Sequence, residues 1–390
     1  MRMKNTALLT GPYDWDPALL PLAEYEGRLA SVRRVLIERG ATALLVHGNS
    51  IEHGALAYLT GFVPKLGPAF ALIPKDAPIR ILASGGPGMM RSAKLLTWVR
   101  DVRPLSNLRS ALGEWLGDVI HDANAVVGLW GGKIMAQRPY TAVASTIQSF
   151  GKLVAMDDPL DALRRRKSPR ELELMCEACH ILAIACDAFE RAAAEGSGAR
   201  SAALAAERAA FAAGAQDVRI LASVRDGGPP LPFDGPGDIR VAPLLVCIAV
   251  RFAGYWAEGL ATLCAPPSGA LARADAALKV MLRTVRAGVT STDLIHVAAM
   301  LLPPYQFHPL VQSAIGNSIG LSFEEPQILG ANEKTTLEEG GVYTLRCGAM
   351  GEGSDSAIVS AMVAVNATGV KVLWSATERS RHRGDTRGSR

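Results

Sequence analysis

The stretch from Leu244 to Leu263, LLVCIAVRFAGYWAEGLATL, limits the possible folds of this chain more than any other. It consists of two apolar runs rich in β-forming residues, a pattern typical of a hairpin. We expect the turn at Phe252-Ala253, with Gly254 supplying the conformational freedom that tight turns need. This turn places Cys247 opposite Glu258 on one side of the hairpin. A thiol that meets a carboxylate inside an apolar segment is unusual for a plain hydrophobic core.

Upstream of the hairpin, helical and strand patterns alternate. Residues 22–40 have the apolar spacing of an amphipathic helix that ends at Gly40. Further patterns follow in the order of the chain. They are strands at 43–46, 70–73 and 79–83, and then helix–strand units that run through 106–119 and 125–130. Such alternation predicts an α/β domain, which we place at residues 21–160 after a tail of residues 1–20.

A boundary follows at the charged run Arg164–Lys167. Ser168 and Pro169 come next, and these residue types commonly cap a helix and occupy its first position. The second domain, residues 161–377, is expected to contain helices at 171–195, 199–213, 271–287 and 291–302, and strands at 307–321, 342–347 and 358–365. We expect the Gly- and Pro-rich segment 227–237 to be a loop rather than a regular element.

Composition argues against several classes of protein. The 390 residues are 49% hydrophobic and carry a formal net charge of +4, which is small for a nucleic-acid-binding protein of this length. Five arginines lie in the tail Glu378–Arg390, which has no apolar periodicity and is expected to be disordered. No apolar run is long enough for a membrane span, Met1–Trp15 lacks a signal-peptide core, and the six cysteines lack a secreted framework. We therefore expect a cytoplasmic protein without nucleic-acid or membrane partners.

The hairpin resembles that of the pita-bread family, which includes methionine and proline aminopeptidases, prolidase and creatinase. The family pattern there is roughly D-x-G-x-R-x-x-G-Y-x-x-D, and both aspartates bind metal. This chain keeps Arg251, Gly254 and Tyr255, and it has Cys247 and Glu258 at the two aspartate positions. The resemblance implies an α+β pita-bread domain preceded by a smaller creatinase-type α/β domain.

Motifs further along the chain extend the resemblance to the remaining ligand positions. Asn317 stands at the histidine of G-H-G-I-G-L, Arg346 at the glutamate of L-x-x-G-M-V-F-T-I-E, and Ser360 at the last ligand, within VSAMVAVNATG. Glu325 matches the glutamate of H-E-P, while the histidine of that motif is absent. Two more segments resemble family motifs, namely 167–173 (KSPRELE) at the start of the pita-bread domain and 49–62 (NSIEHGALAYLTGF) in the N-terminal domain.

The five ligand positions therefore hold a single carboxylate, Glu258, together with the permanent cation Arg346. Divalent metals need several carboxylate or imidazole ligands, so we expect no metal and no other cofactor. A buried guanidinium needs an anionic partner. That partner is either Glu258 itself or the carboxylate of a substrate, and both interpretations stay open at this point.

Creatinase and ectoine hydrolase, which resemble this chain in lacking metal ligands, hydrolyse C–N bonds of small zwitterions. Creatinase uses a histidine in the loop before the hairpin, whereas the matching place here, Leu231–Phe233, has none. The candidates that remain for proton transfer are Glu258, His308 and Glu325. The candidate substrate-binding residues are Arg346, Asn317, Cys247, Ser360, His53 and Asp226. Each has an alternative structural interpretation: buried cysteine is usually inert packing, and Asp226 precedes Gly227 in a turn-like pair.

Two hypotheses follow. The first is a metal-independent, creatinase-like hydrolase or lyase that acts on a C–N bond of a small nitrogen-containing carboxylic acid. The second is a catalytically dead pita-bread protein that binds a ligand or a partner protein. The polar residues kept at Asn317, Arg346 and Ser360 favour the first, because a dead site is expected to turn apolar. The resemblance also implies a homodimer.

Overall fold

The computed structural model describes residues 15–122, 124–223, 225, 228–233, 242–264, 266–303, 306–332 and 334–379. The chain divides into two compact units, Met1–Arg164 and Arg165–Arg390. This division falls within the charged run that the sequence analysis takes as a boundary. Across the described residues, no helix combines the length and the apolarity needed to cross a membrane.

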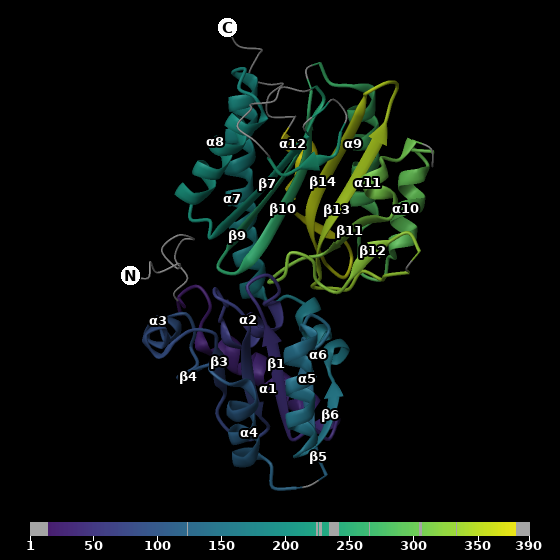
Figure 1. The fold of residues 1–390 in the computed structure, drawn as a ribbon. Helices are drawn as coiled ribbons and strands as arrows, with labels where there is room; N and C mark the ends of the chain where they lie inside the picture. Colours follow the sequence, from purple (N-terminus) through teal and green to yellow (C-terminus); the bar gives the residue numbers. More distant parts are fainter. Residues whose placement is uncertain are drawn as a thin grey trace. The chain divides into compact units, whose positions relative to one another are not determined.

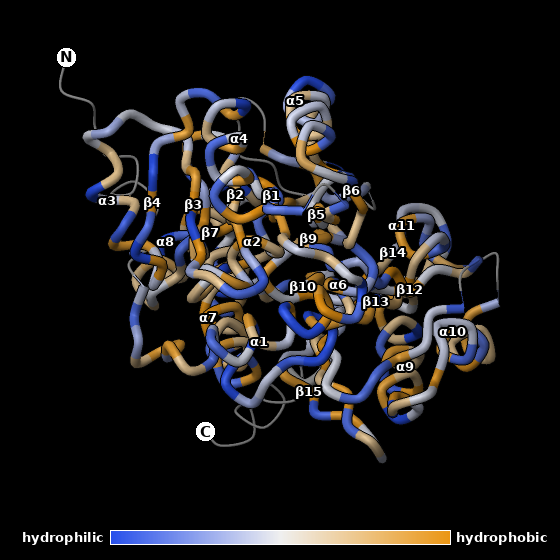
Figure 2. Tube along the Cα trace, turned by 90° about the horizontal axis from the view of Figure 1, so that it is seen from below, coloured by the Kyte–Doolittle hydropathy of each residue, from blue (hydrophilic) through white to orange (hydrophobic). Residues whose placement is uncertain are grey.

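The N-terminal unit is an α/β layer built on a six-stranded sheet with the order β4-β3-β2-β1-β5-β6 (Figure 1). Strands β1 and β2 are buried along their whole length, and Figure 2 shows hydrophobic residues on β1, β2 and β3. Parallel pairs join β1 to β5, β5 to β6 and β3 to β4, whereas β2 is antiparallel to both neighbours. The strands are β1 (Ala43–Gly48), β2 (Ala69–Pro74), β3 (Arg80–Ala83), β4 (Asp101–Pro104), β5 (Ala125–Trp130) and β6 (Gly151–Ala155).

Helices accompany this sheet, and two of them, α1 and α4, match the helical patterns predicted at 22–40 and 106–119. The first of them, α1, ends two residues before Gly40, which has the positive φ of 63° that favours glycine. The helices are α1 (Leu22–Glu38), α2 (Gly54–Thr60), α3 (Met90–Leu95), α4 (Leu108–Val119), α5 (Gln137–Gln148) and α6 (Asp157–Arg165), with a 3₁₀ turn, η2, at Pro87–Met89.

The C-terminal unit contains two antiparallel sheets and their covering helices. The first sheet has the order β10-β9-β7-β8 and the second β12-β11-β13-β14-β15. The strands are β7 (Asp217–Ser223), β8 (Pro230–Leu231), β9 (Leu244–Phe252), β10 (Tyr255–Leu263), β11 (Ala314–Ser318), β12 (Ile328–Gly330), β13 (Val342–Met350), β14 (Ser356–Val365) and β15 (Val370–Ser375). The helices are α7 (Pro169–Ala194), α8 (Ala199–Ala212), α9 (Gly269–Thr284), α10 (Ser291–Ala299), α11 (Pro309–Gln312) and α12 (Ala376–Arg379).

Two helix pairs cover these sheets. The first, α7 with α8, packs against β7, β9 and β10, and the second, α9 with α10, packs against β12, β13 and β14 (Figure 1). Ser168 begins α7 with a capping box in which its hydroxyl accepts from Glu171 N and the Glu171 carboxylate accepts from Ser168 N. The expectation of an α+β domain with two helix pairs is thus confirmed.

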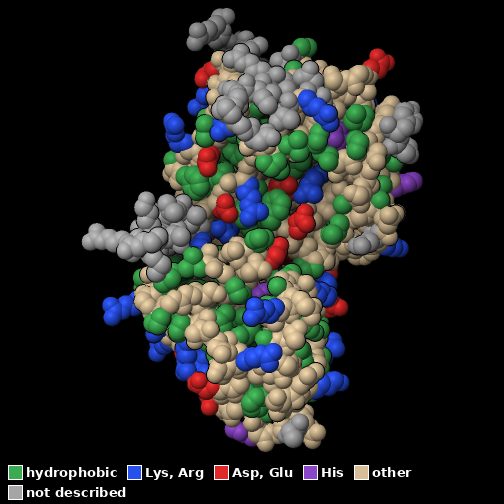
Figure 3. All heavy atoms as spheres, viewed as in Figure 1, with side chains coloured by type: hydrophobic (Ala, Val, Ile, Leu, Met, Phe, Trp, Pro, Cys, Tyr) green, Lys and Arg blue, Asp and Glu red, His purple; other side chains and the backbone are tan. Residues whose placement is uncertain are grey.

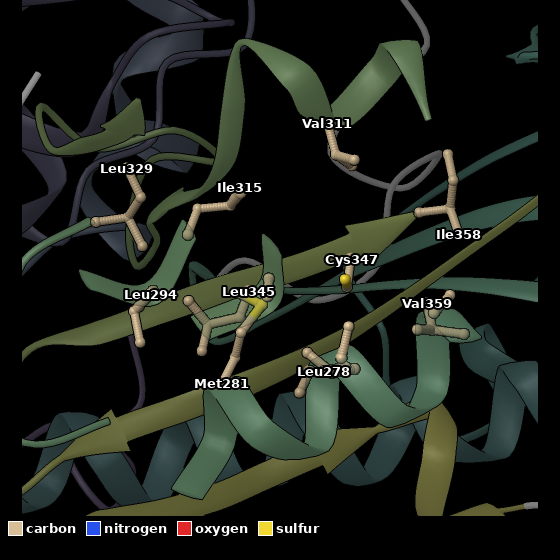
Figure 4. Close-up of a cluster of buried hydrophobic side chains, with 14 of the residues drawn as sticks. Leu278, Met281, Leu294, Val311, Ile315, Leu329, Leu345, Cys347, Ile358 and Val359 are labelled. Atoms are coloured by element: carbon tan, nitrogen blue, oxygen red, sulfur yellow. The ribbon is translucent and has the colours of Figure 1, made fainter. Parts of the chain in front are cut away.

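Packing against α9 decides which face of β13 is left for polar residues. Leu345, Cys347 and Ala349 belong to the hydrophobic core that includes Leu278 and Met281 of α9, and Figure 4 shows Leu345 and Cys347 beside these two residues. Alternate residues of a strand point to opposite faces, so Thr344, Arg346 and Gly348 lie on the other face of β13.

The central hairpin forms, but its register differs from the prediction by two residues. Phe252 pairs with Tyr255, so the turn is Ala253-Gly254, and Cys247 pairs with Leu260 instead of Glu258. Both turn residues have positive φ, 46° for Ala253 and 87° for Gly254, as a type I′ turn requires. A shift of two residues preserves the face on which each side chain lies, so Cys247 and Glu258 remain neighbours on a diagonal.

Other expectations at the level of elements need correction. Segment 307–321, predicted as one strand, instead holds the short helix α11 and the strand β11. Part of the predicted loop 227–237 forms the two-residue strand β8, and residues 234–237 lie outside the described ones. Strands β4, β6, β7, β12 and β15 were not predicted. Helix α12 includes Glu378 and Arg379, the first two residues of the tail that we expected to be disordered.

Candidate functional site

Arg346 contacts the residues at two of the other four ligand positions that the motifs identify. Its Nη2 donates a hydrogen bond to Oε2 of Glu258 at 2.5 Å and another to Oδ1 of Asn317 at 2.9 Å. The pair is largely removed from solvent, since the Arg346 side chain is 16% exposed and that of Glu258 5%. A guanidinium therefore lies directly among the side chains that occupy the family's ligand positions.

Asn317 is oriented by its own contacts. Its Nδ2 donates to the backbone carbonyls of Ser318 at 2.9 Å and Phe323 at 3.3 Å, so its Oδ1 faces the guanidinium. Thr344, opposite Asn317 on β13, also donates to that oxygen, at 3.2 Å. The amide thus presents an acceptor to Arg346, and the contribution of Thr344 was not predicted from the motifs.

Cys247 contacts the same carboxylate from β9. Its Sγ lies 3.7 Å from Oε1 of Glu258 and can donate a weak hydrogen bond to it. Burial and the neighbouring Glu258 raise the pKa of the Cys247 thiol well above its usual value, and Arg346 opposes this only in part. The thiol is therefore protonated at neutral pH and is a poor nucleophile.

Ser360 lies opposite Arg346 on β14 but bonds elsewhere. Its Oγ accepts from Leu260 N at 2.7 Å and donates to Leu260 O at 3.3 Å. These two bonds fasten β10 to β14, at the place where the two sheets meet. Ser360 thereby holds the strand of Glu258 beside the strand of Arg346, and its predicted substrate contact stays a prediction.

Glu325 belongs to a separate buried ion pair. Its Oε2 lies 2.6 Å from Nζ of Lys167, and the two side chains are 3% and 1% exposed. Gly320 makes room for the pair, because a Cβ at that position would lie 2.6 Å from Oε1 of Glu325. We predicted Glu325 for proton transfer, but its partner, Lys167 at the start of the KSPRELE motif, was not predicted.

His308 caps a helix. Its Nδ1 accepts from Leu310 N at 3.2 Å at the start of α11, and its own backbone N–H donates to Gly348 O at 3.0 Å. Burial lowers the pKa of His308, so the imidazole is neutral near pH 7 with its proton on Nε2. Gly348 is two residues from Arg346 and on the same face of β13, so His308 borders the Arg346 face without bonding to the cluster.

Two predicted residues remain. His53 is the buried residue that precedes α2 in the N-terminal unit. Asp226 lies outside the described residues.

The donor set does not fit the pair of divalent cations that the resemblance implies. It offers one carboxylate with a thiol, an amide and a hydroxyl, and it places Arg346 within bonding distance of two of these groups. A cation 4 Å from the guanidinium would be repelled by about 4 kcal/mol per pair of unit charges at an effective dielectric near 20. Over the described part of the chain, no three His, Cys, Asp or Glu side chains are grouped so as to hold a metal ion.

These features define the class of the protein, a pita-bread α+β unit that follows an α/β unit. The chain belongs to metallopeptidase family M24, whose family model matches residues 173–367. A search of curated protein sequences found no match.

Solved structures support the fold. The X-Pro aminopeptidase from Thermotoga maritima is 19% identical with a TM-score of 0.72, covering 89% of this chain and 97% of that one. A prolidase from Thermococcus sibiricus is 17% identical with a TM-score of 0.74, covering 90% and 97%. A His361Ala aminopeptidase P from Escherichia coli is 13% identical with a TM-score of 0.69, covering 94% and 99%.

Proposed function

We propose that this chain is a metal-independent hydrolase that acts on a C–N bond of a small nitrogen-containing carboxylic acid, bound at the Arg346–Glu258 pair. The observation that carries the proposal is the position of Arg346 Nη2, which hydrogen-bonds to Glu258 and Asn317 at once. In this interpretation the guanidinium supplies the fixed positive charge that metal ions supply in the metal-dependent members of the family.

The pair keeps hydrogen-bonding capacity for a ligand. Both hydrogen bonds that Arg346 makes with described residues come from Nη2, and its Nε is buried without a partner among them. On the other side, the one donor that the described residues give to Oε1 of Glu258 is the weak thiol of Cys247. A donor for a carboxylate thus lies beside an acceptor for an N–H group, which suits a small zwitterion.

The proposed reaction uses Glu258 as the general base. The carboxylate accepts a proton from water, and the hydroxide oxygen forms a bond to the carbon of the C–N bond. As that bond breaks, its electron pair stays on nitrogen, which takes up the proton and leaves as an amine. Arg346 holds the substrate carboxylate throughout.

A second candidate is a binding protein without turnover. It is favoured by how the other predicted catalytic groups are used: Glu325 is paired with Lys167 and His308 caps a helix. The two candidates share the same ligand site and differ only in whether product forms.

Calorimetric titration with amino acids, guanidino acids and acylated diamino acids tests the proposal. Wild type should bind at least one of these compounds, and Arg346→Met should lose that binding. Arg208→Met, which removes an exposed arginine of α8, is the matched control and should retain it. If the variant is poorly folded, Arg346→Lys keeps the charge and should retain part of the affinity.

Release of amine or ammonia from the bound compound separates the two candidates. Product formation that Glu258→Gln abolishes supports the hydrolase, and binding without product supports the binding protein. Affinity that Arg346→Met leaves unchanged would refute both.

A further inference from the structure

A second arginine lies on the same face as the Arg346–Glu258 pair. Arg219 of β7 pairs with Ala249 of β9, and Ala249 pairs with Glu258 of β10. Directly paired residues of antiparallel strands share a face, so Arg219 and Glu258 project from the same side with one alanine between them. Since neighbouring strands are about 4.8 Å apart, their backbones are separated by roughly 9.6 Å.

Aromatic rings hold Arg219 in place. Its guanidinium lies 4.4 Å from the centroid of the Trp256 ring and 5.9 Å from that of Phe323. The two rings are themselves in edge contact, with centroids 5.6 Å apart, and Trp256 is 2% exposed. The Arg219 side chain, in contrast, is 49% exposed. The two packed rings thus hold the Arg219 guanidinium in place while solvent can still reach it.

The charges on this face do not balance. On this face of β7, β9 and β10 the charged residues are two arginines and two carboxylates, and Arg346 of β13, which contacts Glu258, adds a third arginine. Glu258 pairs with Arg346. Asp217 lies 3.6 Å from Arg251, whose side chain is only 6% exposed, and 3.8 Å from Arg219. Asp217 is thus shared with a more buried arginine, and the face carries one surplus positive charge. Figure 3 shows basic and acidic side chains gathered in this part of the C-terminal unit.

We propose that Arg219 is a second anion subsite, so that the preferred ligand carries two carboxylates. One carboxylate binds at Arg346 and the other reaches across Ala249 to Arg219. Between the two arginines, Ala249 contributes only a methyl group. This inference rests on the proposed function and narrows its substrate class to acylated amino dicarboxylates.

Two nearly isosteric probes test the subsite. N-acetylglutamate and N-acetylglutamine differ in one terminal group, a carboxylate in the first and an amide in the second. Wild type should bind the dicarboxylate on the order of tenfold more tightly by isothermal titration calorimetry, as one charge-assisted contact implies. Arg219→Gln should bring the two dissociation constants together by weakening only the dicarboxylate. Arg219→Lys should keep most of the preference, and Arg208→Gln on α8 is the control that should keep all of it.

The outcomes separate the two proposals. Equal affinity of wild type for the two probes, or a preference that persists in Arg219→Gln, would overturn the second subsite alone. A lower melting temperature of Arg219→Gln with an unchanged preference would assign Arg219 a purely structural role and would also overturn it. Failure of wild type to bind these probes and every zwitterion tested above would refute the proposed function itself.

Discussion

Replacing Arg346 with methionine should destabilise the fold by about 3 kcal/mol, near the low end of the roughly 3–5 kcal/mol measured when one partner of a buried ion pair is removed. Methionine keeps an unbranched stem in place but removes the charge and the hydrogen bonds to Glu258 and Asn317. The Glu258 carboxylate, 5% exposed in the wild type, is left with the Cys247 thiol as its one side-chain donor among the described residues. We choose the low end because the Arg346 side chain is 16% exposed and water can partly replace it.

A double-mutant cycle measured by urea unfolding tests this magnitude. Glu258→Gln removes the charge that Arg346→Met leaves unpaired, so the double variant should recover much of the loss. Arg208→Met, on the exposed face of α8, should change the unfolding free energy by less than about 0.5 kcal/mol. A loss below about 1 kcal/mol for Arg346→Met, or strictly additive effects in the double variant, would refute the internal pair as we describe it.

Three further predictions concern groups around this site. Lys167→Met should lower the unfolding free energy by about 3–5 kcal/mol because it leaves the buried Glu325 carboxylate without its cationic partner. Arg170→Met, which removes an exposed pair, should lower it by under about 0.5 kcal/mol. Equal losses for the two variants would contradict this prediction. Burial lowers the pKa of His308 below 6.5, so its contribution to stability is present above that pH and is lost on acidification. His308→Asn keeps a capping acceptor, so its unfolding free energy in urea should fall less between about pH 7.5 and 5.5 than that of wild type. An identical fall in the two proteins would exclude His308 as the source of the pH dependence. Because the pKa of the Cys247 thiol is raised, iodoacetamide should label it slowly at neutral pH until urea unfolds the protein. Labelling is followed by mass spectrometry, and rapid labelling of the native protein would contradict this prediction.

The sequence predicted much of the architecture because the spacing of the motifs survives the loss of the ligands. The frame Arg251, Gly254 and Tyr255 located the hairpin, and the later motifs placed Arg346 and Asn317 beside Glu258, where the structure has them. Of the two partners open to Arg346 at the sequence level, the structure shows the internal one, Glu258. These residues are fixed by regular strands, for which the periodicity of side chains is a reliable guide.

What the sequence could not predict depends on local geometry. The hairpin register was wrong by two residues because Ala253 takes up a positive φ of 46°, which non-glycine residues rarely adopt. The helix cap formed by His308 was missed because segment 307–321 was predicted as one strand, whereas it holds the short helix α11. Arg219 was missed because β7, with the sequence DVRILAS, lacks the strict alternation of a half-buried strand.

The central claim is that the Arg346 guanidinium takes the place of the divalent cations, and metal analysis tests it most directly. The purified protein should be incubated with manganese, cobalt and zinc salts, exchanged into metal-free buffer, and measured by inductively coupled plasma mass spectrometry. We expect each metal well below one equivalent per chain, in wild type and in Arg208→Met alike, because the guanidinium repels cations from the only carboxylate among the five ligand positions. Two equivalents of metal per chain would contradict the claim.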